Sequence, residues 1–440
     1  MFGATTPSKS QIFPARNHLV RQPGHQLDST KTLRVAIVLT RDISGSESAG
    51  RVKTLRNICT ALDASFQTSY FRLRNLVEIG KPLQYITALV RTLLSVVQLK
   101  PLPLQSVLHS GSRNISQLAS ELCSGSYDAI YLDSVRSQLL LRKLRRRLKT
   151  SCIIVDLDDL MSRRMDLIIS GRQSVSLGYL RASIPLAVQR LIEGPLSRTL
   201  ARYESVALRH AEQEMSLAAA SVILVSAVER DLLKQRLPDV QKGAVHALPP
   251  PAPAIQRPIL TEPFRFIFIG SDALLQNRLS IDFLIKLWAE LTPAPSLHIY
   301  GRQERRLPEL TNVTWHGYID DLHDAYTTDT IMVLPVLLPG GIKTKAIEAW
   351  SFGRPVLGNV FAFEGLGIEH YPLEVPFDQW RSYILSPQCH SPEWLLAANI
   401  GHAFVQDELS PEKYTLSWRN TILSVANLPG TFKTIITDRE

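Results

Sequence analysis

Two glycines and two lysines stand at the start of a predicted helix in the second half of the chain. Gly340 and Gly341 follow an apolar strand, and Lys343 and Lys345 lie in the first turn of a helix predicted over residues 342–352. A helix N-terminus presents backbone N–H groups that lack partners inside the helix and attract anions. Lysines are unusual there, because the helix dipole alone favours acidic residues. The pattern therefore predicts a pocket for a ligand with several negative charges.

A carboxylate follows on the same helix. Glu348 comes three residues after Lys345, which places both side chains on neighbouring parts of one helical face. Lysines for a diphosphate and a carboxylate for sugar hydroxyls together describe a nucleotide-sugar site. The alternative is that Lys343 and Lys345 form ion pairs with structural carboxylates.

The segment 334–366 resembles the donor-binding signature of glycosyltransferase family 4 (glycosyl transferases group 1). The resemblance implies an α/β chain with the GT-B fold, in which two Rossmann-like domains face each other across a cleft. It also implies a hexosyltransferase-like enzyme, mainly of the retaining type, that needs no metal or other cofactor and uses a nucleoside-diphosphate sugar as substrate. The residues that match the signature, in order, are Gly341, Lys343, Lys345, Glu348, Ala349, Gly353, Pro355, Val356, Glu364, Gly365 and Leu366.

The resemblance assigns roles to these positions. Lys343 and Lys345 would stabilise the leaving diphosphate, and Glu348 would bind the donor ribose, so Lys345 and Glu348 are catalytic candidates. Glu364 would line the sugar–phosphate pocket. The further candidates for donor binding are Gly270 and Arg278 after the first strand of the donor domain, Gly317 in a loop over the base, and Gly340, Gly341, Ile342, Gly365 and Leu366. For Arg278, a surface arginine is an equal alternative to a phosphate contact.

One position departs from the signature. Many family members carry a glutamate eight residues before the one that matches Glu348, and Gly340 stands there. The carboxylate expected near the hydroxyls of the donor sugar is therefore missing. This departure supports an alternative function, a catalytically silent glycosyltransferase-like scaffold in a polysaccharide assembly.

The first half of the chain offers candidates for the acceptor side of the cleft. A strand over residues 33–40 leads into a polar loop and a helix start with Ser46, Gly50 and Arg51, which the resemblance places at the cleft. A surface loop with a capped helix is the alternative. An inverting enzyme would need a general base, for which Asp42 and Asp158 are the candidates.

A second acidic group follows the strand 152–157. Asp156, Asp158 and Asp159 crowd the strand end, where α/β folds place ligands. Asp156 and Asp158 are cleft candidates, and two close carboxylates could supply a general base. We expect at least two of the three to cap the next helix or to pair with Arg163 and Arg164 instead. No cluster of His, Cys or further acidic residues accompanies them, so no metal site is predicted.

Apolar runs and a proline-rich stretch divide the chain. Residues 1–32 are predicted to be a flexible extension, 33–250 a Rossmann-like acceptor domain, 251–263 a linker, and 264–385 the donor domain. Residues 386–440 are predicted to be helices that cross back to the first domain. Further strands are expected at 127–133, 264–270, 296–301, 312–317, 330–336 and 355–360, and helices at 195–220, 277–291 and 320–326. Ser226 is predicted to cap the helix that follows it, with Glu229 at the capping-box position.

Charge separates the two halves and suggests partners. Residues 1–250 carry 34 Lys and Arg against 19 Asp and Glu, whereas the remainder is acidic. Residues 137–150 form a strongly basic segment, and residues 72–110 have apolar positions at helical spacing, which fits either an interfacial membrane helix or a core helix. No aromatic residues alternate with the arginines, so an anionic membrane surface is favoured over nucleic acid.

The expected partners are thus a nucleotide sugar, a glycan or lipid-linked acceptor, and an anionic membrane surface. Four scattered cysteines, the lack of a signal-like apolar start and the lack of a spanning segment favour a cytoplasmic protein, peripheral at the inner membrane face.

Overall fold

The computed structural model describes residues 33–44, 50–80, 82–148, 152–171, 197–253 and 255–426, with the backbone alone for 82–85 and 89. Residues from Leu33 onward belong to one compact unit. Ser46 and the predicted N-terminal extension lie outside the described residues.

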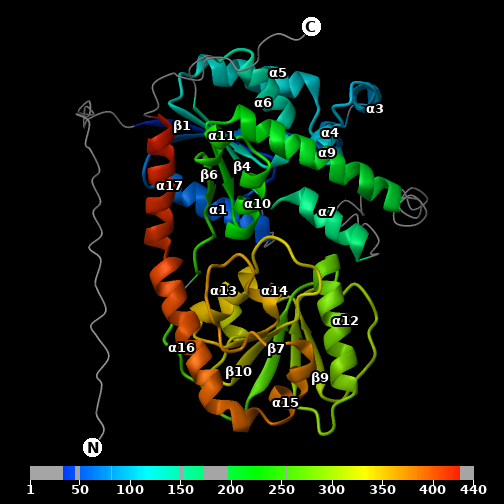
Figure 1. Cartoon of the computed structure of the whole chain (residues 1–440), viewed down its shortest axis with the longest axis vertical. Coiled ribbons are helices and arrows are strands. Elements are labelled where there is room, and N and C mark those ends of the chain that lie inside the picture. The colour runs from blue at the N-terminus through cyan, green and yellow to red at the C-terminus, as the bar shows by residue number, and fades with distance from the viewer. Residues whose placement is uncertain are drawn as a thin grey trace, which may run out of the picture. The chain divides into compact units, whose positions relative to one another are not determined.

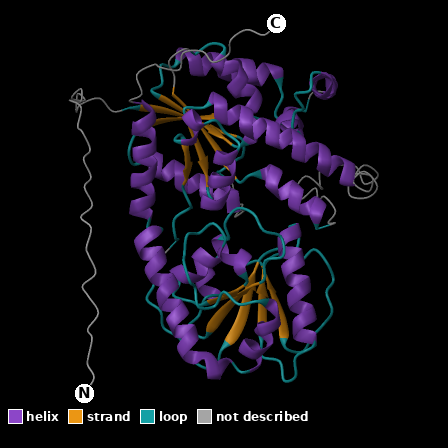
Figure 2. Ribbon diagram, in the orientation of Figure 1, coloured by secondary structure: helices purple, strands orange, loops and turns teal. Residues whose placement is uncertain are grey.

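The first sheet is parallel and has six strands (Figures 1 and 2). Its order is β2 (Gln67–Arg72), β1 (Arg34–Leu39), β3 (Ala129–Asp133), β4 (Cys152–Asp158), β5 (Ser221–Leu224) and β6 (Val245–Ala247). Side chains of a strand alternate between two cores, because Val35 and Ile37 pack on one face and Ala36 and Val38 on the other. Both faces are therefore buried, as in a doubly covered parallel sheet.

Helices cover the two faces of this sheet. One core receives side chains of α1 (Gly50–Asp63) and α17 (Pro411–Ala426), and the other those of α5 (Ser112–Ser124), α6 (Gln138–Arg145) and α9 (Ser197–Ala218). Among the residues that the structure describes, this part also has the helices α2 (Leu76–Ile79), α3 (Pro82–Val97), α4 (Leu104–Leu108), α7 (Met161–Ser170), α10 (Ala227–Gln235) and α11 (Asp239–Lys242), and a 3₁₀ turn, η1 (Val135–Ser137).

The second sheet is also parallel. Its order is β11 (Val356–Gly358), β10 (Thr330–Leu334), β7 (Arg265–Ile269), β8 (Leu297–Tyr300) and β9 (Val313–Gly317). Helices of this part are α12 (Leu275–Ala289), α13 (Thr344–Ser351), α14 (Val360–Phe363), α15 (Trp380–Leu385) and α16 (Ser391–Glu408), with short 3₁₀ turns η3 (Leu322–Asp324), η4 (Phe377–Gln379) and η5 (Pro387–His390). The α/β fold class with two parallel sheets, predicted from the sequence, is confirmed.

Two helix predictions in this part need correction. The helix expected over residues 320–326 is only the 3₁₀ turn η3, which begins after Asp321 caps the amide of His323. The helix expected from Ile342 begins at Thr344, because Lys343 is the N-cap residue and has an extended backbone, with φ of −99° and ψ of 90°. The predicted glycine turn ahead of it has positive φ at both Gly340 and Gly341, of 118° and 59°.

The last two helices contact different sheets. Helix α16 packs on α13, whereas α17 packs on α1, β3 and β4. Trp418 of α17 is fully buried, with its ring edge against Tyr131 at 5.7 Å between centroids. Among the described helices, none combines the length and the apolar character that crossing a bilayer requires.

A buried carboxylate ties α9 to α4 and makes stability depend on pH. Glu204 is 7% exposed and accepts a hydrogen bond from the backbone N–H of Leu104 at 2.9 Å. Burial raises its pKa from 4.5 to about 7. The folded chain thus keeps a proton that the unfolded chain releases, so the free energy of unfolding falls as pH rises through this window.

Replacing Glu204 with glutamine should abolish this loss. The amide oxygen can still accept from Leu104, and the variant should be more stable than the parent by about 2 to 3 kcal/mol above the window, with no gain below it. Urea denaturation on either side of the window measures this. The control is Glu121→Gln on the exposed face of α5, which should change little at any pH. Equal stability of parent and Glu204→Gln above the window would contradict the assignment.

Candidate functional site

The loop between β10 and α13 already holds an anionic oxygen. The backbone N–H of Gly341 donates to Oε1 of Glu229 at 3.0 Å, and Glu229 is fully buried. The positive φ of Gly341 favours glycine, and a Cβ there would lie 2.4 Å from Oδ1 of Asp159. The close approach of Asp159 explains why position 341 needs glycine. The separate bond to Glu229 means that the loop amide binds a carboxylate oxygen.

Lys343 stands at the N-cap of α13. Its ammonium donates to the carbonyl of Gly340, and burial lowers its pKa to about 8, an effect that the nearby Asp159 opposes. Ile342, beside it in the loop, is half-buried. The ammonium of Lys343 thus lies at the N-terminal end of α13 and donates to a carbonyl, not to a carboxylate.

Lys345 points toward α12. Its Nζ lies 3.1 Å from Oδ1 of Asn277, and burial lowers its pKa. Within the part of the chain that the structure describes, neither Lys343 nor Lys345 forms an ion pair with a carboxylate. The alternative of structural ion pairs for these lysines therefore finds no support.

Glu348 contacts the first half of the chain. Its Oε1 lies 3.3 Å from Nζ of Lys53 on α1, and the Glu348 side chain is 15% exposed. Lys53 is a contact that the sequence did not single out. Helix α1 and helix α13 therefore meet at the predicted ribose-binding carboxylate.

Glu364 pairs with an arginine of α7. Its Oε1 lies 2.8 Å from the guanidinium of Arg163. Gly365 has φ of 80°, and a Cβ on it would lie 2.2 Å from Oγ of Ser226, while the side chain of Leu366 is buried. The loop that follows α14 thus lies directly on the residues that end β5.

Of the other predicted donor residues, Gly270 packs on the site, whereas the printed bonds of Gly317 and Arg278 go to Gly301 and Asp272. A Cβ on Gly270 would lie 2.8 Å from Asn277, the partner of Lys345, and the carbonyl of Gly317 accepts from Gly301 at 2.6 Å. Arg278 donates from Nε to the carbonyl of Asp272 at 3.3 Å. That bond ties Arg278 to its own loop.

In the first half of the chain, Arg51 of α1 forms ion pairs with three carboxylates near the ends of β3 and β4. Its guanidinium lies 2.8 Å from Asp133, 2.9 Å from Asp156 and 2.9 Å from Asp158. Tyr131 donates to Asp156 at 2.6 Å. Gly50, the first residue of α1, precedes the arginine and would tolerate a Cβ, since nothing lies within 4 Å.

Asp158 is the least conventional residue of this cluster. It has φ of 67° beside a bulge in the pairing of β4 with β5, and a quarter of its side chain (25%) stays exposed. Burial raises its pKa to about 7, whereas hydrogen bonds from Ser44 lower the pKa of Asp42 to about 2. Of the two candidate bases, Asp158 therefore fits proton transfer near neutral pH better.

The expected pairing of the acidic group with Arg163 and Arg164 is correct for one residue only. Asp159 bonds to Arg164, but Asp156 and Asp158 turn to Arg51. Side chains at alternate strand positions point the same way, so Asp156 and Asp158 reach α1 together while Asp159 follows the turn toward α7.

The predicted cap of α10 is confirmed, with a correction for its partner. Ser226 accepts from the backbone N–H of Glu229. The Glu229 carboxylate, however, does not complete a capping box. It accepts from the backbone N–H groups of Leu160 at 3.0 Å and of Gly341. The capping-box pattern accounted for Glu229 locally, so the sequence did not indicate its contact with the loop before α13.

Sequence reasoning missed four residues of the site. Asp133 had a usable signal, because it ends a strand as Asp156 does, and Asn277 stood next to a predicted residue. Lys53 and Glu229 had none, since both act on distant segments. Among the described residues, no group of three His, Cys, Asp or Glu side chains could hold a metal ion.

Comparisons with known proteins identify one family model and several solved structures that match the chain. Residues 263–364 match the family model described as "Glycosyl transferases group 1". No curated protein sequence matches the chain. The matched segment holds the loop before α13, both lysines and Glu348, which the sequence predicts to bind the donor.

Solved structures with the same fold are glycosyltransferases. The apo lipopolysaccharide outer core galactosyltransferase WaaB matches with a TM-score of 0.53 and 11% identity, over 89% of this chain and 99% of that one. Anabaena Alr3699/HepE in complex with UDP-glucose matches with a TM-score of 0.52 and 14% identity, over 89% and 100%. A Rickettsia africae ESF-5 glycosyltransferase matches with 0.51 and 9%, over 90% and 100%. The TM-scores show a shared GT-B fold, and identities of 9% to 14% show nothing beyond the fold.

Proposed function

We propose that the protein is a glycosyltransferase that moves a sugar from a nucleoside-diphosphate donor to a glycan or lipid-linked acceptor. The observation that carries the proposal is the loop before α13. Its Gly341 amide binds an anionic oxygen, and the ammonium groups of Lys343 and Lys345 lie beside it without carboxylate partners in the described part of the chain. A diphosphate would replace the Glu229 carboxylate and supply the missing negative charge.

The residues of the site offer a chemical group for each part of the proposed reaction. Fixed N–H and ammonium donors stabilise charge that develops on the leaving diphosphate, which needs no metal ion. Glu348 takes the donor ribose, and Glu364 with the backbone of Gly365 lines the sugar–phosphate pocket. A retaining, hexosyltransferase-like reaction needs no separate base. An inverting one would use Asp158.

The second candidate is a catalytically silent scaffold in a polysaccharide assembly, for which Gly340 is the argument. A carboxylate is nevertheless close to this position. Oε1 of Glu229 lies 3.7 Å from the place that a Cβ on Gly340 would take. This proximity favours the enzyme, because Oε2 of Glu229 accepts from the backbone N–H of Leu160 and would keep the carboxylate near position 340 after a diphosphate takes the Gly341 amide.

We further propose a cytoplasmic protein, peripheral at the inner membrane face, that serves polysaccharide or glycolipid synthesis. Support comes from the basic first half of the chain and from the outer-core galactosyltransferase among the structures with the same fold. We propose uracil as the donor base to test first, because HepE, which has the same fold, was solved with UDP-glucose.

Thermal unfolding with a panel of nucleoside diphosphates and their sugars tests the function. Nucleotides that carry one particular base should raise the midpoint temperature of unfolding. A ligand at one hundred times its dissociation constant adds about 2.7 kcal/mol to the free energy of unfolding. Release of the nucleoside diphosphate from the matching sugar then separates enzyme from scaffold. Absence of any shift across the panel would contradict both candidates, and a shift without turnover, with acceptors supplied, would favour the scaffold.

A further inference from the structure

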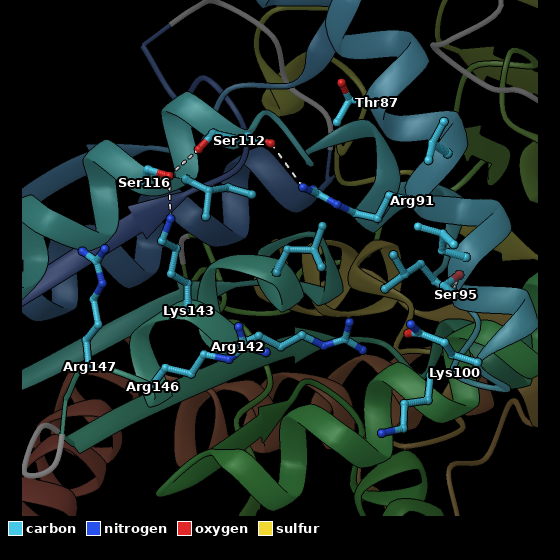
Figure 3. Close-up of a pocket in the computed structure, with 16 residues that line it drawn as sticks. Thr87, Arg91, Ser95, Lys100, Ser112, Ser116, Arg142, Lys143, Arg146 and Arg147 are labelled. Carbon is cyan, nitrogen blue, oxygen red and sulfur yellow. Dashed lines mark hydrogen bonds between the residues drawn. The ribbon is translucent and has the colours of Figure 1, made fainter. Parts of the chain in front are cut away.

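A pocket of about 630 Å³ lies away from the donor loop, between α3, α5 and α6 (Figure 3). Its wall is cationic. Within the described part of the chain, none of its lining residues is acidic. The lining cations are Arg91, Lys100, Arg142, Lys143, Arg146 and Arg147.

Three of the six cations, Arg91, Lys143 and Arg147, donate to neutral oxygens. Lys143 bonds to Oγ of Ser116 at 2.5 Å, and Arg91 donates to the carbonyl of Ser110 at 2.9 Å and to Ser112. Arg142 does have a carboxylate partner, Glu214. Burial and the positive charge of Arg142 lower the pKa of Arg91, which shows that the cations repel one another. The pocket therefore has positive charge in excess of its counter-ions.

The side of the pocket formed by α3 is apolar and exposed. Val90 and Leu94 line the pocket and are 49% and 54% exposed. Their neighbours continue this surface along α3 and just beyond it. Ile86, Leu93, Val97 and Leu99 are 60%, 59%, 79% and 85% exposed. Of the two readings of residues 72–110, an interfacial helix and a core helix, these exposures favour the interfacial one.

Helix α6 contributes only its charges. Leu140, Leu141 and Leu144 are buried in the core of the first sheet, so its apolar face is not available to a membrane. The cations of α6 and the apolar side chains of α3 thus meet at one pocket from two elements. A ligand that satisfies both must carry anionic and apolar parts.

We propose that this pocket seats the phosphate headgroup of an anionic phospholipid while α3 lies in the headgroup–acyl boundary of the bilayer. The proposal rests on the peripheral membrane location proposed above and gives it a defined surface. It does not depend on sugar transfer. The cations take the phosphate, and the apolar residues of α3 add buried area, the combination that binds amphipathic helices to anionic membranes.

Other occupants fit less well. A two-fold contact with a second copy would place the same cation cluster against itself. Single-stranded nucleic acid needs aromatic stacking platforms, and no lining residue in the described chain is aromatic. Neither occupant explains why the apolar face of α3 adjoins the charges.

Flotation with vesicles tests the proposal. The full chain should float with vesicles of phosphatidylcholine mixed with phosphatidylglycerol and stay behind with phosphatidylcholine alone. Arg146→Glu combined with Arg147→Glu should weaken binding at least about 25-fold, because each cation near the surface contributes about fivefold. Both arginines are exposed, so folding should be unaffected. Leu93→Asp with Val97→Asp, which removes apolar contact, should also weaken binding.

The control reverses two exposed cations elsewhere. Lys286→Glu with Arg306→Glu makes the same charge change on the donor side and should leave flotation near the parent level. Equal losses in both charge variants, equal binding to neutral vesicles, or no flotation would overturn the proposal. Competition by inorganic phosphate that abolishes flotation would reassign the pocket to free phosphate. RNA binding without vesicle binding would reassign it to nucleic acid.

Nucleotide binding by the same variants separates this proposal from the proposed function. Arg146→Glu with Arg147→Glu should keep the thermal shift with the donor nucleotide. Flotation as expected without any nucleotide shift would reject the transferase and keep the membrane surface.

Discussion

Replacing Arg51 with alanine is expected to lower the free energy of unfolding by about 3 to 5 kcal/mol. The arginine side chain is 7% exposed and is the shared partner of Asp133, Asp156 and Asp158, of which the first two are buried. Removing one partner of a buried ionic group leaves the other charges without compensation, which costs more than the group contributed when intact. Urea denaturation followed by circular dichroism measures the change.

Two further measurements make this expectation specific. Arg74→Ala removes an exposed arginine from the same half of the chain and should change stability by no more than about 0.5 kcal/mol. The loss in Arg51→Ala should shrink in acid, because protonated carboxyl groups no longer need a cation. A loss no larger than that of Arg74→Ala would mean that the cluster does not hold the ends of β3 and β4 together.

Replacing Lys345 with alanine is expected to lower the rate of sugar transfer about 100- to 1,000-fold. The ammonium is held by Asn277 at 3.1 Å, so it is positioned before the donor binds and pays no reorganisation cost when charge develops on the diphosphate. Single-turnover measurements with the donor found by thermal shift give the rate.

The matched control for this variant is Lys286→Ala, an exposed lysine on α12, which should keep the parent rate. Thermal unfolding shows whether either variant is misfolded. A Lys345→Ala rate within a few-fold of the parent would remove the lysine from the leaving-group site. If Lys345→Ala loses both its rate and its folded state, the measurement is repeated with Lys345→Met, which keeps the packing of the side-chain stem.

Elements of the fold were predictable where one segment carries its own signal. The apolar runs at β1, β4, β7 and β10 identify buried parallel strands without help from the rest of the chain. The two glycines and two lysines around the start of α13 were recognisable for the same reason, because they lie within six consecutive residues. The start of α13 was placed two residues early, because only the backbone shows that Lys343 is extended and caps the helix.

Contacts between distant segments were not predictable. The carboxylate of Glu229 had a sufficient local interpretation as part of a helix cap, and nothing nearby indicates that it reaches Gly341. Lys53 lies 295 residues before its partner Glu348. Asp156 and Asp158 pair with Arg51, which lies 105 and 107 residues earlier in the chain. Such features arise from tertiary packing and leave no periodic trace in one sequence.

The charge asymmetry shows the same division. The sequence located the cations of α6 but could not tell which side of the helix the core would take. The structure buries its leucines and leaves its arginines beside the exposed face of α3. A strongly basic helix thus serves as one wall of a pocket, and not as a membrane helix by itself.

The central claim is that the loop before α13 binds a nucleoside diphosphate through Gly341 and the two lysines. Isothermal titration with the diphosphate selected by the thermal panel measures it on the parent, Lys345→Ala and Lys286→Ala. We expect binding by the parent and by Lys286→Ala with equal affinity, and a loss of at least about tenfold in Lys345→Ala, because a hydrogen bond to a charged group contributes about 1.5 to 3 kcal/mol. Binding of equal strength by Lys345→Ala would contradict the claim.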